Sequence, residues 1–139
     1  MPFNPNEPEL TSEETRELVA ETIETKEIAM FVKGNRHMPQ CGYSDKALSL
    51  VHHYRDADDV AVVNVLQNLP VFREALETHS GWETIPQVFV DGEFVGGSDI
   101  LETLAERGEL AETLNADPES ASPPFIGKSE DSTDVEAPF

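Results

Sequence analysis

The stretch FVKGNRHMPQCGYS, residues 31–44, decides how this chain folds and what chemistry it offers. It contains the only cysteine, Cys41, at the point where an apolar run ends and a helical pattern begins. A helix start presents unpaired backbone N–H groups and the positive end of the helix dipole, and both stabilise a thiolate over a thiol. Lys33, Arg36 and Lys46 lie within eight residues of the cysteine and add positive charge. We therefore interpret Cys41 as a reactive or metal-ligating thiolate; for an isolated cysteine the alternative is a small buried apolar side chain.

Acidic charge dominates the composition. The 139 residues fit one domain and include 28 acidic against 9 basic side chains, a formal net charge of −19. Much of the excess lies near the ends, since residues 1–27 carry 8 acids and 2 bases and residues 109–139 carry 8 acids and 1 base. Such a field repels nucleic acid and anionic lipid, so we expect neither as a partner. A high-salt cytoplasm favours this balance, and we expect a halophilic source.

The cysteine content and the N-terminal residues bear on the compartment. One cysteine cannot form an internal disulfide, which argues against a disulfide-stabilised secreted domain. The start, MPFNPNE, has neither the positive region nor the apolar region of a signal peptide. No apolar run approaches the ~20 residues that a membrane-spanning helix needs. We expect a soluble cytoplasmic protein with no membrane part.

Hydrophobic periodicity predicts alternating helices and strands. Thr11 and Glu14 have the spacing of a capping box, and an apolar stripe continues to about Thr25. Ser98 is expected to cap a helix that carries Ile100 among its apolar residues and ends at Gly108. The other expected helices span about 42–55, 70–79 and 110–114, and the expected strands span 28–32, 60–66, 87–90 and 93–95.

The order of these elements predicts the fold. A helix separates the runs 28–32 and 60–66, so these two strands are expected to pair in parallel. Asp91-Gly92 between the last two strands is a strong hairpin signal. The order α-β-α-β-α-β-β-α, with a thiol at a strand–helix junction, resembles that of the thioredoxin fold. This resemblance implies an α/β, thioredoxin-like fold, in which a four-stranded mixed sheet is flanked by helices on both faces. We expect an irregular arm at residues 1–10, one domain at 11–114, and a disordered acidic tail rich in proline and serine at 115–139.

Four blocks of sequence resemble the monothiol glutaredoxins. They occur in the family's order and at similar spacing, and the resemblance runs from about Thr11 to Leu114. Two positions depart from the family pattern: Tyr43 stands where phenylalanine is usual, and Glu83 follows the tryptophan where proline is common. The four blocks are Phe31-Val32-Lys33-Gly34, Cys41-Gly42-Tyr43-Ser44, Trp82 with Ile85-Pro86-Gln87, and Gly96-Gly97-Ser98-Asp99.

Ser44 stands where dithiol oxidoreductases have a second cysteine, so an intramolecular disulfide cycle cannot run through Cys41. The thiolate is left to form a mixed disulfide with a small thiol or to ligate a soft metal centre. The resemblance implies the second use: a 2Fe–2S cluster held in a homodimer by one cysteine from each subunit and one thiolate from each of two glutathiones. It further implies iron–sulfur recipient proteins and a BolA-like protein as partners.

The resemblance also implies residues that hold the small thiol. Lys33 and Arg73 would bind the glycine carboxylate of glutathione, and Ile85, before a cis Pro86, would pair with its cysteine backbone. The start of the last long helix would hold the γ-glutamyl end. Each residue has an ordinary alternative, namely a solvated cation, a trans proline before an edge strand, or a helix cap with a first-turn acid. The residues expected to contact the thiol are Lys33, Tyr43, Arg73, Ile85, Pro86, Gly97, Ser98 and Asp99.

Several alternatives stay open from the sequence. The chain is alternatively a glutathione-dependent oxidoreductase that removes glutathione from protein mixed disulfides through Cys41, or an interaction module for a BolA-like protein. The small thiol is alternatively γ-glutamylcysteine, which lacks the terminal glycine and would change what Lys33 and Arg73 contact. His37 precedes the cysteine by four residues, but no other histidine has ligand spacing. We expect His37 to be an exposed loop residue that modulates the thiolate rather than a zinc ligand.

Overall fold

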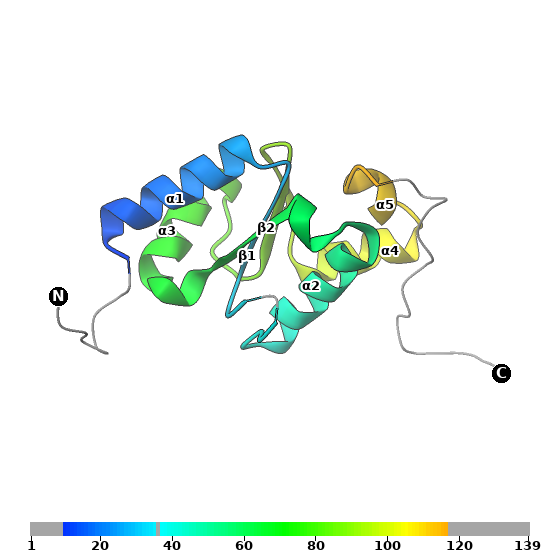
Figure 1. Cartoon of the computed structure of the whole chain (residues 1–139), viewed down its shortest axis with the longest axis horizontal. Coiled ribbons are helices and arrows are strands. Elements are labelled where there is room, and N and C mark those ends of the chain that lie inside the picture. Colours follow the sequence, from blue (N-terminus) through cyan, green and yellow to red (C-terminus); the bar gives the residue numbers. More distant parts are fainter. Residues whose placement is uncertain (1–9, 36, 117–139) are drawn as a thin grey trace.

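The computed structural model describes residues 10–35 and 37–116, and its centre is a mixed sheet of four strands in the order β2-β1-β3-β4 (Figure 1). β1 pairs in parallel with β2 and antiparallel with β3, which pairs antiparallel with β4. The four-stranded mixed sheet, the parallel β1–β2 pair and the β3–β4 hairpin are as the sequence predicts; the pairing of β1 with β3 comes from the structure. Nearly all of the expected irregular arm and of the expected acidic tail fall outside the described residues. The strands are β1 (Ile28–Val32), β2 (Val60–Asn64), β3 (Gln87–Val90) and β4 (Glu93–Gly96).

Helices cover both faces of the sheet, as expected. In Figure 1, α1 and α3 lie together on one side of the strands, and α2 and α4 lie on the other. None of the helices in residues 10–35 and 37–116 is long and apolar enough to cross a membrane. The helices are α1 (Ser12–Thr25), α2 (Gly42–Tyr54), α3 (Leu69–Ser80), α4 (Ser98–Glu106) and α5 (Leu110–Thr113), with single 3₁₀ turns η1 (Ala57–Asp59) and η2 (Val65–Gln67).

The central strand β1 is apolar throughout because both of its faces are covered. All five of its residues are buried. Ile28, Met30 and Val32 pack in the cluster beneath α2 and α4. Ala29 and Phe31 point the other way and pack against α1 and α3. A strand buried on two faces reads as a continuous apolar run rather than as an alternation, which is why the sequence located it.

The second strand is shorter than the sequence predicts. It ends at Asn64, whereas the apolar run suggested an end at Leu66. The Asn64 side chain accepts hydrogen bonds from the N–H of Leu66 at 2.9 Å and from the N–H of Gly34 at 3.0 Å. These bonds turn the chain into η2, so Val65 is buried without belonging to the sheet. A side-chain acceptor here overrides the β propensity of the run.

Two helix starts can be compared with their predictions. The capping box of α1 is present, because the Glu14 N–H donates to the Thr11 hydroxyl at 3.1 Å and the Thr11 N–H donates to the Glu14 carboxylate at 2.9 Å. The prediction for α4 is wrong by one residue. Gly97 is its N-cap, and Ser98 is the first helical residue, buried and making no side-chain cap.

Arg55, at the end of α2, ties three segments together. Its Nη2 lies 2.9 Å from Glu27 Oε1 beside the start of β1, and its Nη1 donates to the carbonyl of Leu114 at 2.7 Å. The hydrogen bond from Arg55 is the largest cause of a lowered pKa at Glu27, and a hydrogen bond from Asn115 lowers it further. The C-terminal end of the described chain is thereby fixed to the body of the fold.

Glu27→Gln is expected to lower the free energy of unfolding at neutral pH by less than about 1 kcal/mol, because the Glu27 carboxylate is solvent-screened. The pKa of Glu27 is lower in the folded than in the unfolded chain, so its contribution is complete above the ordinary value of 4.5 and is lost as the pH falls through the lowered value. Urea denaturation at a series of pH values should show the gap to wild type closing in acid. The exposed Glu24→Gln is the control, and a gap independent of pH would contradict this assignment.

Candidate functional site

Cys41 is the N-cap of α2, at the position that the sequence predicts. Its Sγ accepts a hydrogen bond from the backbone N–H of Ser44 at 3.3 Å, and the residue is partly exposed. The sulfur therefore lies among the unpaired N–H groups of a helix start while remaining open to solvent. A helix start offers N–H donors to an anionic sulfur ligand or nucleophile, and the partial exposure of the residue leaves it reachable from solvent. The alternative of a cysteine sealed in the core is wrong.

Ser44 bridges the sulfur to the end of β1. Its side chain is fully buried, its Oγ accepts the backbone N–H of Lys33 at 3.1 Å, and the same Oγ lies 3.1 Å from Cys41 Sγ. Because the oxygen already accepts from Lys33, its own proton is available to the sulfur when the sulfur is a thiolate. From the sequence, Ser44 is only the position where a second cysteine is missing. Its place three residues after an N-cap was the signal for this contact.

Ser44→Ala is expected to slow alkylation of Cys41 by iodoacetamide at neutral pH by about tenfold, since a hydrogen bond to a charged group contributes roughly 1.5 kcal/mol. The measurement is the pseudo-first-order rate of adduct formation by mass spectrometry. Ser49→Ala, an exposed serine on the same helix, is the matched control and should react like wild type. Equal rates for the two variants would show that the Ser44 hydroxyl does not act on the sulfur.

The loop before Cys41 is held by hydrogen bonds that backbone N–H groups donate. The Gln40 N–H donates to the Lys33 carbonyl at 2.7 Å, and Gly34 donates its N–H to Asn64. Gly34 has φ of +99°, and a Cβ there would lie 2.5 Å from the Met38 carbonyl oxygen. The loop therefore closes against the ends of β1 and β2 and fixes where Cys41 stands. Asn64 was missed by sequence reasoning because its partner Gly34 is 30 residues away.

The charges near the cysteine differ from the expectation. Lys46 Nζ forms an ion pair with Glu102 Oε2 at 3.1 Å, so its charge is directed to α4. Lys33 is half-buried directly after β1, and Arg36 falls outside the described residues. His37 is exposed, and its N–H donates to Asn35 Oδ1 at 2.9 Å. Of the two lysines near Cys41 that the structure describes, Lys46 is therefore paired with Glu102, and Lys33 takes no part in that ion pair.

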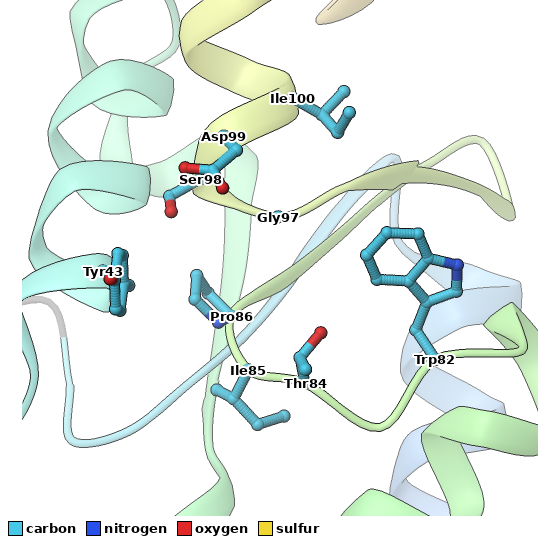
Figure 2. A pocket seen from close by; sticks show the side chains of 9 residues that line it. All are labelled: Tyr43, Trp82, Thr84, Ile85, Pro86, Gly97, Ser98, Asp99 and Ile100. Carbon is cyan, nitrogen blue, oxygen red and sulfur yellow. The ribbon is translucent and has the colours of Figure 1, made fainter.

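A cavity of about 480 Å³ opens beside the start of α2 (Figure 2). In Figure 2, Pro86 lies between Tyr43 on one side and Trp82 on the other, and the start of α4 overhangs them. The bond between Ile85 and Pro86 is cis, as expected. Six of the residues expected to hold a thiol share this cavity. Its lining is Tyr43, Trp82, Thr84, Ile85, Pro86, Gly97, Ser98, Asp99 and Ile100.

The cavity has a polar end and an apolar end. Ser98 and Asp99 are in the first turn of α4, where backbone N–H groups suit an anionic group. Trp82 and Ile100 are 53% and 41% exposed and form an apolar border. A short peptide with a charged terminus fits such a lining. Lys33, Cys41 and Arg73 are not among the lining residues, although Cys41 precedes the lining residue Tyr43 by two positions.

Three lining residues were not expected. In the sequence, Trp82 belongs to a block that resembles the glutaredoxins, Thr84 carries no signal of its own, and Ile100 is expected on the apolar face of its helix. Ile100 instead follows directly after Ser98 and Asp99, so the same first turn places it at the cavity. A large apolar residue directly after Gly96-Gly97-Ser98-Asp99 could have indicated that Ile100 lines the cavity.

The donor groups bear on whether a metal centre fits. Within residues 10–35 and 37–116 there is no group of three or more histidine, cysteine, aspartate or glutamate side chains placed to hold a metal ion. Cys41 offers one soft thiolate ligand. A cluster at this sulfur would need its remaining ligands from outside the chain, either from small thiols or from a second copy.

Comparison with known proteins identifies similar chains. Residues 28–95 match the sequence profile of the glutaredoxin family. A monothiol glutaredoxin of Porphyra purpurea is 38% identical over 106 residues, which cover 74% of this chain and 96% of that protein. The mitochondrial monothiol glutaredoxin-5 of Schizosaccharomyces pombe is 40% identical, over 76% of this chain and 72% of its own length.

Solved structures agree in fold. The solution structure of reduced poplar apo GrxS14 superposes with a TM-score of 0.61 at 31% identity, covering 72% of this chain and 89% of that one. A crystal structure of a buckwheat glutaredoxin–glutathione complex gives a TM-score of 0.61 over 75% of this chain and 90% of that one. Its identity is 20%, so this likeness concerns the fold alone.

Proposed function

The chain belongs to the monothiol glutaredoxin family, and from this premise we propose that it carries a 2Fe–2S cluster between two copies of itself and passes the cluster to recipient proteins. Cys41 of each copy ligates iron, and each of two small thiols supplies one further thiolate. The observation that carries the proposal is the placement of the only cysteine, open to solvent at a helix start beside a cavity for a short peptide.

The small thiol is proposed to lie in the cavity with its sulfur toward Cys41. Ile85 pairs with the backbone of its cysteine, and Ser98 and Asp99 hold its γ-glutamyl end, next to Tyr43, Pro86 and Gly97. The first-turn N–H groups of α4 support this orientation, because they attract a carboxylate. Lys33 and Arg73, both half-buried outside the cavity, are proposed to meet the terminal carboxylate of glutathione.

The cluster is cargo, and the chain's part is to hold and present it. One cysteine gives one ligand, so neither copy holds the cluster alone and release follows when the dimer or the thiol dissociates. Iron–sulfur recipient proteins take it up, and a BolA-like protein is proposed as a further partner. If Cys41→Ser still binds such a partner, the partner surface is independent of the cluster.

A second candidate function uses the same sulfur as a nucleophile, and the accessibility of Cys41 favours it. The Cys41 thiolate attacks the glutathione sulfur of a protein mixed disulfide, the protein leaves as a thiol, and Cys41 becomes bonded to glutathione. A second glutathione thiolate then attacks that disulfide, releasing Cys41 and forming glutathione disulfide. Rapid turnover of a glutathionylated substrate would favour this reading.

Anaerobic reconstitution with ferrous iron, sulfide and glutathione tests the proposal. The expected product is a coloured dimer, and omission of glutathione should prevent its formation. γ-Glutamylcysteine in place of glutathione decides between the two thiols. A colourless monomer under all of these conditions would refute cluster carriage.

The dimer is also expected to depend on salt. Each chain carries a net charge of −19, so two copies repel one another unless the charge is screened. Raising potassium chloride from about 0.1 M to about 1 M shortens the screening length from roughly 10 Å to 3 Å and should increase the dimer fraction of cluster-loaded protein. Sedimentation velocity measures it, with cluster-free protein as the control. A dimer fraction that falls with salt would contradict this expectation.

A further inference from the structure

Gln87, the first residue of β3, reaches from the sheet to the wall of the cavity. It is 1% exposed, and its Nε2 donates to the carbonyl of Trp82 at 2.8 Å and to the carbonyl of Thr84 at 3.1 Å. Both carbonyls belong to segment 82–84, and both Trp82 and Thr84 line the cavity. One buried amide therefore holds both ends of a three-residue stretch of cavity wall.

The other half of the same amide is unsatisfied. Gln87 Oε1 is buried and has no hydrogen-bond partner among the described residues. A buried acceptor without a partner destabilises a fold, whereas an apolar side chain of similar length would not carry this penalty. What an apolar side chain cannot provide is the pair of N–H groups on Nε2. The amide thus contributes to the position of segment 82–84 more than to the stability of the core.

Segment 82–84 lies at the surface, so its position depends on few contacts. Trp82, Glu83 and Thr84 are all exposed. The Trp82 N–H donates to Ser80 Oγ at 3.0 Å, which holds the first residue, and the Trp82 ring lies 6.0 Å from the ring of Phe94. The hydrogen bond from Gln87 reaches the far end, at Thr84, directly before Ile85. Without this bond the Thr84 carbonyl is free to turn to water.

We propose that Gln87 is a positioning residue for thiol binding, which sets the place of Ile85 by holding the carbonyls of Trp82 and Thr84. The inference rests on the proposed function, because Ile85 is the residue proposed to pair with the bound thiol. Loss of the Gln87 N–H groups lowers the affinity of the cavity for the thiol peptide. It is expected to leave Cys41 and the start of α2 unchanged, since the Gln87 amide donates to Trp82 and Thr84.

Two reactions of Cys41 distinguish weaker thiol binding in the cavity from a change at the cysteine itself. In the first, the Cys41 thiolate attacks one sulfur of glutathione disulfide, the disulfide breaks, and one glutathione leaves as a thiolate; this reaction uses the cavity. In the second, iodoacetamide alkylates Cys41 and does not need the cavity. The variants are Gln87→Met and Gln87→Glu, neither of which has the amide N–H groups. The matched control is Gln67→Met, since Gln67 Nε2 makes a similar bond to the Asn64 carbonyl at 2.9 Å away from the cavity.

Both Gln87 variants are expected to react about tenfold more slowly with glutathione disulfide, because the hydrogen bonds to Trp82 and Thr84 are lost together, while alkylation stays within about twofold. Emission of Trp82, the only tryptophan, should shift in Gln87→Met and not in Gln67→Met. If Gln87→Glu fails to fold because it buries a carboxylate, Gln87→Met decides alone.

Two results would overturn the inference while leaving the proposed function intact. These are a rate with glutathione disulfide equal to that of wild type, and an equal loss in both reactions. A different result would overturn both: wild-type protein reacting no faster with glutathione disulfide than with hydroxyethyl disulfide, which has no peptide. In that case the cavity does not recognise the thiol at all.

Discussion

Cys41→Ser is expected to lose cluster binding completely and to stay monomeric after reconstitution with iron, sulfide and glutathione. The chain has no other cysteine, and a serine hydroxyl is a hard, protonated group that does not replace a thiolate on iron. Iron and sulfide content, the visible spectrum and sedimentation measure the loss. Wild-type protein treated in parallel gives the reference.

The same substitution is expected to leave the fold intact. Residue 41 is the N-cap of α2, and serine is among the preferred N-cap residues, so the variant should be as stable as wild type or more stable by up to about 1 kcal/mol. Urea denaturation checks this. A colourless Cys41→Ser protein with full stability then reports on ligation alone, whereas a coloured dimer from this variant would show that the iron is held elsewhere.

Gly34→Ala is expected to damage the site severely. Gly34 has φ of +99°, and an added Cβ would lie 2.5 Å from the Met38 carbonyl oxygen and 2.8 Å from the Gln40 nitrogen. Both neighbours are backbone atoms, so the loop before Cys41 must move. We expect the free energy of unfolding to fall by about 3 kcal/mol or more and cluster yield to fall with it.

Gly81→Ala is the matched control for this change. Gly81 also has a positive φ, of +80°, but an added Cβ there meets nothing within 4 Å. Its cost should be about 1 kcal/mol, from the left-handed backbone alone. Urea denaturation of both variants isolates the clash from the backbone penalty. Equal losses for Gly34→Ala and Gly81→Ala would show that the loop before Cys41 tolerates displacement.

Much of the fold was predictable because its signals are local. The buried strands β1 and β3 appear as apolar runs, Asp91-Gly92 gives the hairpin, and the helical pattern after Cys41 gives α2. Two element boundaries were predicted wrongly, the end of β2 and the N-cap of α4. The Asn64 side chain ended β2 early, and Gly97 rather than the following serine became the N-cap of α4.

The candidate site was predictable to a smaller extent. Resemblance to the glutaredoxins identified six cavity residues and the cis Pro86, but it also pointed to Lys33 and Arg73, which do not line the cavity. The hydrogen bonds of Gln87 depend on how a strand and a preceding loop fold against each other. Periodicity and composition carry no information about such side-chain contacts, so they appear only in three dimensions.

Native mass spectrometry of the reconstituted protein tests the account most directly, because it counts chains, cluster and small thiols in one species. The account predicts two chains, one 2Fe–2S cluster and two glutathione molecules, with Cys41→Ser giving only the single bare chain. A cluster bound to one chain, or a cluster-loaded dimer that contains no small thiol, would contradict it.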